Sequence, residues 1–140
     1  MKIFGIGTDI VSVGRLKNSL KNKKFLKRVF NNNEIYKCNK IVTSYNCFAK
    51  RFAAKEAFSK ALGTGISKGI NFNEIIILNE KSGKPYIRLL DKTKKIVEKK
   101  LKRKKYKISL SLSDEKKYAV AFVTISIWEK KILWNQSLIT

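Results

Sequence analysis

The chain has 140 residues, which is enough for one hydrophobic core and too few for two of ordinary size. A hydrophobic fraction of 44% is typical of a globular protein and excludes wholesale disorder. With 32 basic and 10 acidic residues, the formal net charge of +22 should attract polyanions: nucleic acid, acidic membranes, acidic proteins or phosphate-bearing small molecules. Compositional drift toward lysine and asparagine explains the same charge without any partner, so charge alone assigns no function.

Histidine is absent from the sequence, and its absence excludes a large class of sites. No histidine triad, histidine base or histidine-ligated metal is possible, so catalysis must use carboxylates, lysines, hydroxyls or a hard metal ion. We interpret Cys38 and Cys47, which lack metal-ligand spacing, as lone thiols that suit a reducing compartment. Neither a signal peptide nor the ~20 apolar residues of a membrane span is visible. We therefore expect a soluble, cytoplasmic protein with no membrane partner.

The first predicted element is a strand over Ile3–Val11, in which Gly5 and Gly7 permit close approach of another backbone. Residues 14–31 place apolar side chains among lysines at helical spacing, which predicts one or two amphipathic helices. Asn33 is expected to cap the helix that follows.

The clearest helix runs from about Ser44 to Leu62 and is apolar on nearly all sides, which predicts a buried helix. Further elements are predicted in chain order: a strand over 75–78, a turn with Gly83, a strand over 85–90, an exposed basic helix over 93–105, and strands over 107–113 and 118–128. The pattern predicts one α+β domain, residues 1–127, with a small antiparallel sheet packed on the long helix. Residues 128–140 form a tail of unassigned role.

Three ionisable residues stand out because their predicted surroundings are apolar. Glu56 and Lys60 are four apart on the buried helix, where a charge is costly unless compensated; an ordinary helical ion pair between them is the simpler interpretation. Asp9 lies near the end of the glycine-flanked strand. Two such carboxylates from distant parts of the chain can hold Mg²⁺, which binds substrate phosphates. Because Gly63-Thr64-Gly65 and Ser82-Gly83-Lys84 are potential phosphate-binding loops, the residues suggest a metal–phosphate site.

Four segments resemble the signatures of the holo-acyl-carrier-protein synthases, which are 4′-phosphopantetheinyl transferases. They are Ile3–Val11 with Arg15, Phe52–Ile66, Gly83–Tyr86, and Ser111–Ser113 before Tyr118-Ala119. The second is similar to the family's central signature almost residue for residue, and the segments occur in family order over most of the chain. The resemblance implies the 4′-phosphopantetheinyl transferase fold.

One position departs from the family pattern. Where the family usually has Ser-x-Ser-His, this chain has Ser111-Leu112-Ser113-Asp114, so an acceptor that repels phosphate replaces a cation-capable donor. Either the histidine is dispensable, or Lys116 or Lys117 substitutes for it. A relative that binds coenzyme A and has lost the transfer activity is therefore one alternative.

The resemblance implies transfer of 4′-phosphopantetheine from coenzyme A to a serine of apo-acyl carrier protein in fatty acid biosynthesis, with release of 3′,5′-ADP. Asp9 and Glu56 would bind Mg²⁺ across the coenzyme A pyrophosphate, and Lys60 would neutralise phosphate charge. Lys60, Glu56 and a metal-bound water are alternatives for the general base. Together with Lys60, the following residues would line the nucleotide and 3′-phosphate pocket: Arg51, Gly63, Thr64, Gly83, Lys84, Pro85, Ser111 and Ser113.

The family resemblance further implies a homotrimer whose coenzyme A sites are shared between neighbouring subunits. Arg15, Lys17 and Lys21 would face the acidic carrier protein, whose charge would speed association. A basic nucleic-acid-binding module is the competing interpretation, supported by the net charge and the lysine-rich run 99–107. Because the chain has no nucleic-acid signature, and no aromatic residues interleaved with that run, we expect no nucleic-acid partner.

Overall fold

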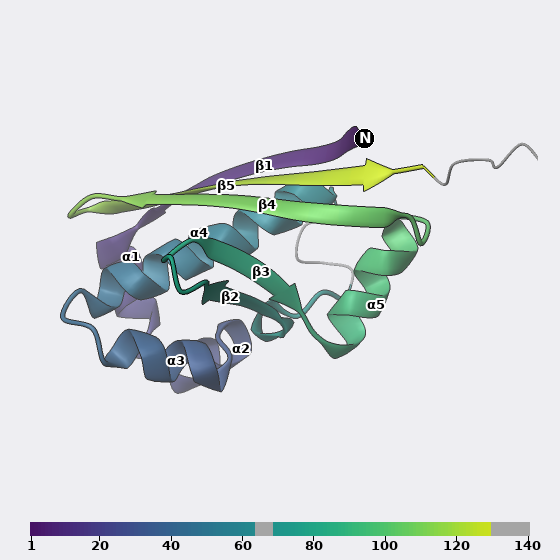
Figure 1. Cartoon of the computed structure of the whole chain (residues 1–140). Coiled ribbons are helices and arrows are strands. Elements are labelled where there is room, and N and C mark those ends of the chain that lie inside the picture. The colour runs from purple at the N-terminus through teal and green to yellow at the C-terminus, as the bar shows by residue number, and fades with distance from the viewer. Residues whose placement is uncertain (64–68, 130–140) are drawn as a thin grey trace, which may run out of the picture.

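The computed structural model of the chain describes residues 1–63 and 69–129 (Figure 1). Its elements follow in the order β1 (Lys2–Ser12), α1 (Val13–Ser19), α2 (Lys23–Val29), α3 (Asn32–Asn39), α4 (Ser44–Leu62), the 3₁₀ turn η2 (Phe72–Glu74), β2 (Ile75–Asn79), β3 (Pro85–Leu89), α5 (Asp91–Lys100), β4 (Lys105–Asp114) and β5 (Tyr118–Trp128). The α+β class is confirmed. Its strands form two antiparallel sheets, one ordered β1-β5-β4 and the other the β2-β3 hairpin, where a single small sheet was predicted.

Helix α4 is the centre of the fold and packs along one face of the three-stranded sheet (Figure 1). Alternate residues of the middle strand β5 point at the helix and are fully or nearly fully buried: Ala119, Ala121, Val123, Ile125 and Ile127. The helix contributes small buried side chains, the alanines at 49, 53, 54, 57 and 61. Because small side chains on both surfaces let the backbones approach, the helix lies close to the strands. The hairpin, α5 and α1–α3 lie on the same side of the sheet as the helix, and β3 also contacts β4 (Figure 1).

The glycines of β1 are required by this packing. A Cβ atom at Gly5 would lie 1.8 Å from the carbonyl oxygen of Ala61, and one at Gly7 would lie 1.8 Å from that of Ala57. The predicted close backbone approach is therefore confirmed, and its partner is α4. Since alternate residues of a strand share a face, Asp9 points toward the same helix.

We predict that Gly7→Ala destabilises the protein by about 1–3 kcal/mol or more, because the added methyl must displace backbone atoms of both elements. Gly14→Ala is the matched control, since a Cβ at that position in α1 meets no atom within 4 Å. The control should change the free energy of unfolding by less than about 1 kcal/mol, in the stabilising direction of helix propensity. Urea denaturation measures both, and equal effects would contradict this account of the glycines.

The start of α3 differs from the prediction. Asn31, and not Asn33, is the N-cap: its side chain accepts a hydrogen bond from the Asn33 amide, while the Glu34 carboxylate accepts one from the Asn31 amide at 3.0 Å. This reciprocal capping box starts the helix two residues earlier. The basic helix predicted over 93–105 is α5, which ends at Lys100 because Lys102 and Arg103 adopt left-handed backbone angles.

The two cysteines were wrongly interpreted as lone thiols. Cys38 in α3 and Cys47 in α4 form a disulfide, and both are buried. Disulfides are rare in reducing compartments, so this pairing does not support the inference about compartment that was drawn from the cysteines. No helix in the described part of the chain is both long enough and apolar enough to cross a membrane.

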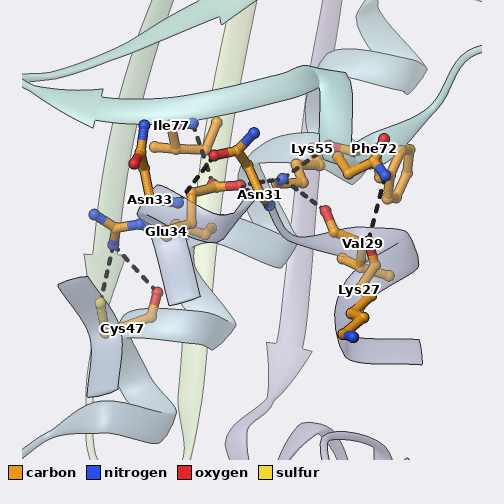
Figure 2. A network of polar contacts seen from close by, with 11 residues as sticks. Lys27, Val29, Asn31, Asn33, Glu34, Cys47, Lys55, Phe72 and Ile77 are labelled. Carbon is orange, nitrogen blue, oxygen red and sulfur yellow. Dashed lines mark hydrogen bonds and ion pairs between the residues drawn. The ribbon is translucent and has the colours of Figure 1, made fainter. Parts of the chain in front are cut away.

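A fully buried ion pair fixes α4 on the side away from the sheet (Figure 2). Lys55 Nζ donates to Glu34 Oε1 at 2.6 Å and to the carbonyl oxygens of Val29 and Phe72 at 2.7 and 2.8 Å. The other Glu34 oxygen accepts from the Ile77 amide at 3.2 Å. Burial lowers the pKa of Lys55 to about 8, against the attraction of Glu34. The pair therefore joins α4 to α2, α3, η2 and β2.

Candidate active site

Asp9, Glu56 and Lys60 come together where β1 crosses α4. Lys60 Nζ donates to Asp9 Oδ1 at 3.1 Å and to the Thr8 carbonyl oxygen, also at 3.1 Å. Among the ion pairs of the described residues, none joins Glu56 to Lys60. The helical Glu–Lys pair is therefore not formed, because Lys60 reaches across to the strand.

Asp9 and Glu56 line the same cavity, which has a volume of about 410 Å³. Part of its wall is apolar, contributed by Phe25 and Phe52. Arg15 of α1 also lines it and adds a positive charge beside the carboxylates. The cavity thus combines two acidic side chains, a nearby lysine and an arginine at an open surface.

The electrostatics of this cavity favour a cation. Burial raises the pKa of Glu56, repulsion from Asp9 raises it further, and Lys60 opposes both effects. No cluster of three or more potential metal-ligating side chains exists within residues 1–63 and 69–129. A pair of carboxylates nevertheless fits Mg²⁺, which keeps several waters and takes other ligands from substrate phosphates.

The raised pKa of Glu56 predicts how the metal-free protein responds to pH. Between the ordinary value and the raised one, the folded state binds more protons than the unfolded state, so the free energy of unfolding falls as pH rises. Glu56→Gln removes this penalty. In EDTA, the stability of the variant minus that of the wild type should therefore increase with pH through this window and then become constant. Urea denaturation over a pH series measures the difference, and a flat or falling profile would contradict the assignment.

The residues predicted to bind nucleotide fall into separate groups. Arg51 points away from the cavity toward the β2-β3 hairpin, where its Nη2 donates to Asn79 Oδ1 at 3.3 Å. Asn79 Nδ2 donates to the Gly83 carbonyl oxygen at 2.9 Å, so Arg51 lies near the turn that carries Lys84 and Pro85. Arg51 is only 4% exposed, which was not expected of a residue lining a pocket.

The two serines lie on the opposite side of the three-stranded sheet from α4. Ser111 and Ser113 are exposed residues of β4, level with Phe122 and Val120 of β5. Gly63 ends α4 in the left-handed conformation, as predicted. Thr64 lies outside the described residues. Among the described residues, a single chain therefore brings Lys60 to the Asp9–Glu56 cavity but not Arg51, Ser111 or Ser113.

Asp114, which stands where the family usually has histidine, has partners on α4. Lys50 Nζ lies 3.5 Å from Asp114 Oδ1, and Asn46 Nδ2 donates to Asp114 Oδ2 at 2.9 Å. Part of its negative charge is thus compensated within the chain. This reduces the repulsion of phosphate expected at this position.

The basic residues on and just after α1 line two different surfaces. Arg15 lines the carboxylate cavity, whereas Lys17 and Lys21 line a neighbouring groove with Tyr45. Lys17 Nζ lies 5.0 Å from the centre of the Tyr45 ring. The cavity and the groove thus both border α1, with Arg15 at the cavity and Lys17 at the groove.

Sequence reasoning missed Lys37 and Asn79, which lie beside Arg51. Lys37 was indistinguishable from the other lysines, and Asn79 from the residues of an ordinary turn. The spacing of Arg51, Lys55 and Ser59, four residues apart, was the available signal that one face of the predicted buried helix is polar. Arg51 and Lys55 have partners on α2, α3, η2 and the hairpin, whereas the buried Ser59 hydroxyl has none among the described residues.

Known proteins resemble this chain over most of its length. A model of the 4′-phosphopantetheinyl transferase superfamily matches residues 5–123. The holo-(acyl-carrier-protein) synthase of Pelagibacter ubique (strain HTCC1062) is 52% identical over 125 residues, which cover 89% of this chain and 98% of the relative. A crystal structure of the holo-(acyl-carrier-protein) synthase from Neisseria meningitidis superposes with a TM-score of 0.79 at 38% identity, over 89% of this chain and 98% of that one. The Bacillus anthracis synthase in complex with CoA (3′,5′-ADP) gives a TM-score of 0.74 at 33% identity, over 91% of this chain and 100% of that one.

Proposed function

This chain belongs to the 4′-phosphopantetheinyl transferase superfamily, and on that premise we propose that it acts as a holo-(acyl-carrier-protein) synthase. It transfers 4′-phosphopantetheine from coenzyme A to a serine of apo-acyl carrier protein and releases 3′,5′-ADP, as a step of fatty acid biosynthesis. The observation that carries the proposal is that Asp9 and Glu56, far apart in the sequence, line one cavity next to Lys60.

Asp9 and Glu56 hold Mg²⁺ in this proposal. Support for this assignment comes from the raised pKa of Glu56, which burial and then repulsion from Asp9 produce, because a divalent cation would relieve both. When bound, Mg²⁺ supplies Lewis-acid charge to the diphosphate of coenzyme A. The protein contributes two anionic ligands at fixed positions, one from β1 and one from α4.

The residues of the cavity have distinct roles in the reaction. The serine oxygen attacks the β-phosphorus of coenzyme A, and the bond from that phosphorus to the bridging oxygen breaks, so the negative charge departs with 3′,5′-ADP. Lys60, held by Asp9 and the Thr8 carbonyl oxygen, stabilises this departing charge. The serine proton passes to a base at the cavity, for which Lys60 and Glu56 are the candidates among the protein's own residues.

The complete site is shared between subunits of a homotrimer. Supporting this, the side of the three-stranded sheet away from α4 carries no element within the described residues and exposes Ile6, Ile10 and Phe122 by 56%, 65% and 45% (Figure 1). Ser111 and Ser113 border this apolar surface. A second copy seated there would bury the surface and bring its own cavity to the serines.

The acidic carrier protein docks on the basic rim formed by Arg15, Lys17 and Lys21. Arg15 lines the cavity itself, and the two lysines line the adjoining groove. Opposite charges would steer association and make the rate fall with ionic strength. We place the reaction in the cytoplasm on the basis of its substrate, coenzyme A.

A mass measurement tests the activity directly. Purified protein, Mg²⁺, coenzyme A and apo-carrier protein should yield a carrier heavier by one phosphopantetheinyl group. A carrier with its acceptor serine replaced by alanine is the control and should not change mass. Absence of any gain, together with RNA binding that is unaffected by Asp9→Ala, would overturn the proposal in favour of a nucleic-acid-binding module. Coenzyme A binding without transfer would instead indicate a relative that has lost activity.

Mixed trimers test the sharing of sites. Glu56→Gln disables the cavity, and Ser111→Glu places a negative charge on the sheet surface that is proposed to meet the neighbouring subunit's cavity. Each variant alone should be nearly inactive. In trimers co-expressed from equal amounts of both variants, about one site in four combines an intact half from each of two subunits, so the mixture should recover about a quarter of the wild-type rate. No recovery would show that each site is built within one subunit.

A further inference from the structure

A disulfide joins the last turn of α3 to the start of α4. Cys38 is next to the last residue of α3, and Cys47 lies near the N-terminus of α4. The residues that follow Cys38, 39–43, are all exposed. Glu34 anchors the first turn of α3 to α4 through Lys55, whereas the disulfide holds the last turn. Breaking the disulfide would therefore release the end of α3 from α4 and leave its beginning in place.

The surroundings of Cys47 stabilise a thiolate. Arg51 Nη1 donates to Cys47 Sγ at 3.1 Å and to the Cys47 carbonyl oxygen at 3.3 Å (Figure 2). A guanidinium and a helix N-terminus both favour the thiolate form of a cysteine, and a stabilised thiolate is the better leaving group in thiol–disulfide exchange. Cys47 is therefore the sulfur that leaves, and Cys38 is the sulfur that is attacked. Since Cys38 is fully buried, attack requires the last turn of α3 to open, as helix ends bordered by exposed segments do.

The two cysteines flank the groove beside α1. Asn39 follows Cys38 directly, and Tyr45 and Phe48 lie on either side of Cys47 in the sequence; all three line this groove, which has a volume of about 360 Å³. The groove also contains the two lysines that are proposed to face the carrier protein. The disulfide thus fixes the wall that comes from α3 against the wall that comes from α4.

We propose that Cys38 and Cys47 are a reversible redox switch that sets the affinity of this groove for the carrier protein, with the disulfide form binding more tightly. The inference rests on the proposed function, in which the carrier protein docks at the groove. In the reducing compartment proposed for the reaction, disulfides are usually transient and serve either catalysis or redox sensing. Neither cysteine lines the Asp9–Glu56 cavity, which leaves sensing.

The chemistry of the switch is ordinary thiol–disulfide exchange with an external dithiol. A thiolate of the dithiol attacks Cys38 Sγ, the bond between the two cysteine sulfurs breaks, and its electron pair leaves on Cys47 Sγ beside Arg51. The second thiol of the reductant then displaces Cys38. Two electrons and two protons pass to the protein, and the dithiol becomes a disulfide. A small disulfide such as glutathione disulfide reverses the reaction.

The rate at which the folded protein is reduced tests the exchange. Dithiothreitol without denaturant should release both thiols, counted by mass after alkylation with N-ethylmaleimide. Arg51→Met should slow the reduction about tenfold, because the leaving thiolate loses a charged hydrogen bond. Lys50→Met is the matched control, since it removes a charge from the same helix at a residue that pairs with Asp114, and its rate should stay within about twofold of the wild type. Thermal denaturation shows whether each variant is folded.

Steady-state kinetics tests the control of docking. At saturating coenzyme A, reduction should raise the KM for the carrier protein about threefold or more, because the released groove adopts the binding form only part of the time. The kcat should stay within about twofold, since the residues proposed to act on coenzyme A lie in the separate cavity. Cys38→Ser/Cys47→Ser should have the carrier KM of the reduced wild type both with and without dithiothreitol.

Three results would overturn the proposal: reduction that requires denaturant, Arg51→Met reduced as fast as Lys50→Met, or the same carrier KM in oxidised and reduced wild type. A response of the double variant to dithiothreitol as large as that of the wild type would also overturn it. All of these leave transfer itself intact. Failure of the proposed function would instead appear as no gain in carrier mass in either redox state.

Discussion

Asp9→Asn and Glu56→Gln should each reduce the rate of phosphopantetheine transfer by about 10²–10³-fold or more, because each removes one of the two carboxylates proposed to hold Mg²⁺. The substitutions keep the size and planarity of the side chains, so the protein should remain folded. The rate of carrier mass gain at saturating coenzyme A measures the effect. A Mg²⁺ titration of each variant should show that high metal concentration restores only part of the rate.

Two further measurements separate this loss of activity from a general effect of removing a negative charge. Glu98→Gln makes the same change on α5, outside the cavity, and should leave the rate within about twofold of the wild type. Glu56→Gln should be inactive although its metal-free form is more stable than the wild type at neutral pH, because an uncharged side chain escapes the burial and repulsion that raise the Glu56 pKa. Full activity in either cavity variant would show that the metal ligands are assigned incorrectly.

Much of the scaffold could be predicted because it depends on local patterns. The bounds of α4 follow from a continuous apolar pattern closed by a glycine, and Gly5 and Gly7 indicated a strand pressed against another backbone. The start of α3 could not be predicted, since Asn31 and Asn33 are equally good caps in isolation. The Glu34 carboxylate selects Asn31, because it accepts a hydrogen bond from the Asn31 amide in the capping box and also pairs with Lys55.

The pairing of charges depends on contacts that no local rule contains. Lys60 is placed four residues from Glu56, as in a helical ion pair, but it bonds to Asp9 because β1 brings a carboxylate and the Thr8 carbonyl oxygen within reach. Lys55 is chemically identical to Lys60, an exposed lysine of the same helix. Its burial requires several separate segments to meet around it. The resemblance identified Asp9 and Glu56 as a pair, whereas their common cavity is a property of the fold.

Lys55→Met should be the most destabilising single substitution among the charged residues of α4, with a loss of about 3–5 kcal/mol in the free energy of unfolding. The ammonium group makes one ion pair and two hydrogen bonds to backbone carbonyls, all in the interior. Methionine fills the space but leaves the Glu34 carboxylate buried without a counter-ion. Because small domains are stable by only about 5–15 kcal/mol, urea denaturation should show a large shift of the midpoint.

Lys50→Met is the matched control, since Lys50 is on the same helix and pairs with Asp114 at a partly exposed position. Its loss should be less than about 1 kcal/mol, the ordinary range for a surface ion pair. The double variant Glu34→Leu/Lys55→Met should be less destabilised than the sum of the two single variants, because it removes both members of the pair and leaves no isolated charge in the interior. Additive losses would mean that the two residues stabilise the fold independently, Lys55 through the Val29 and Phe72 carbonyl oxygens and Glu34 through the Ile77 amide, and not as an ion pair.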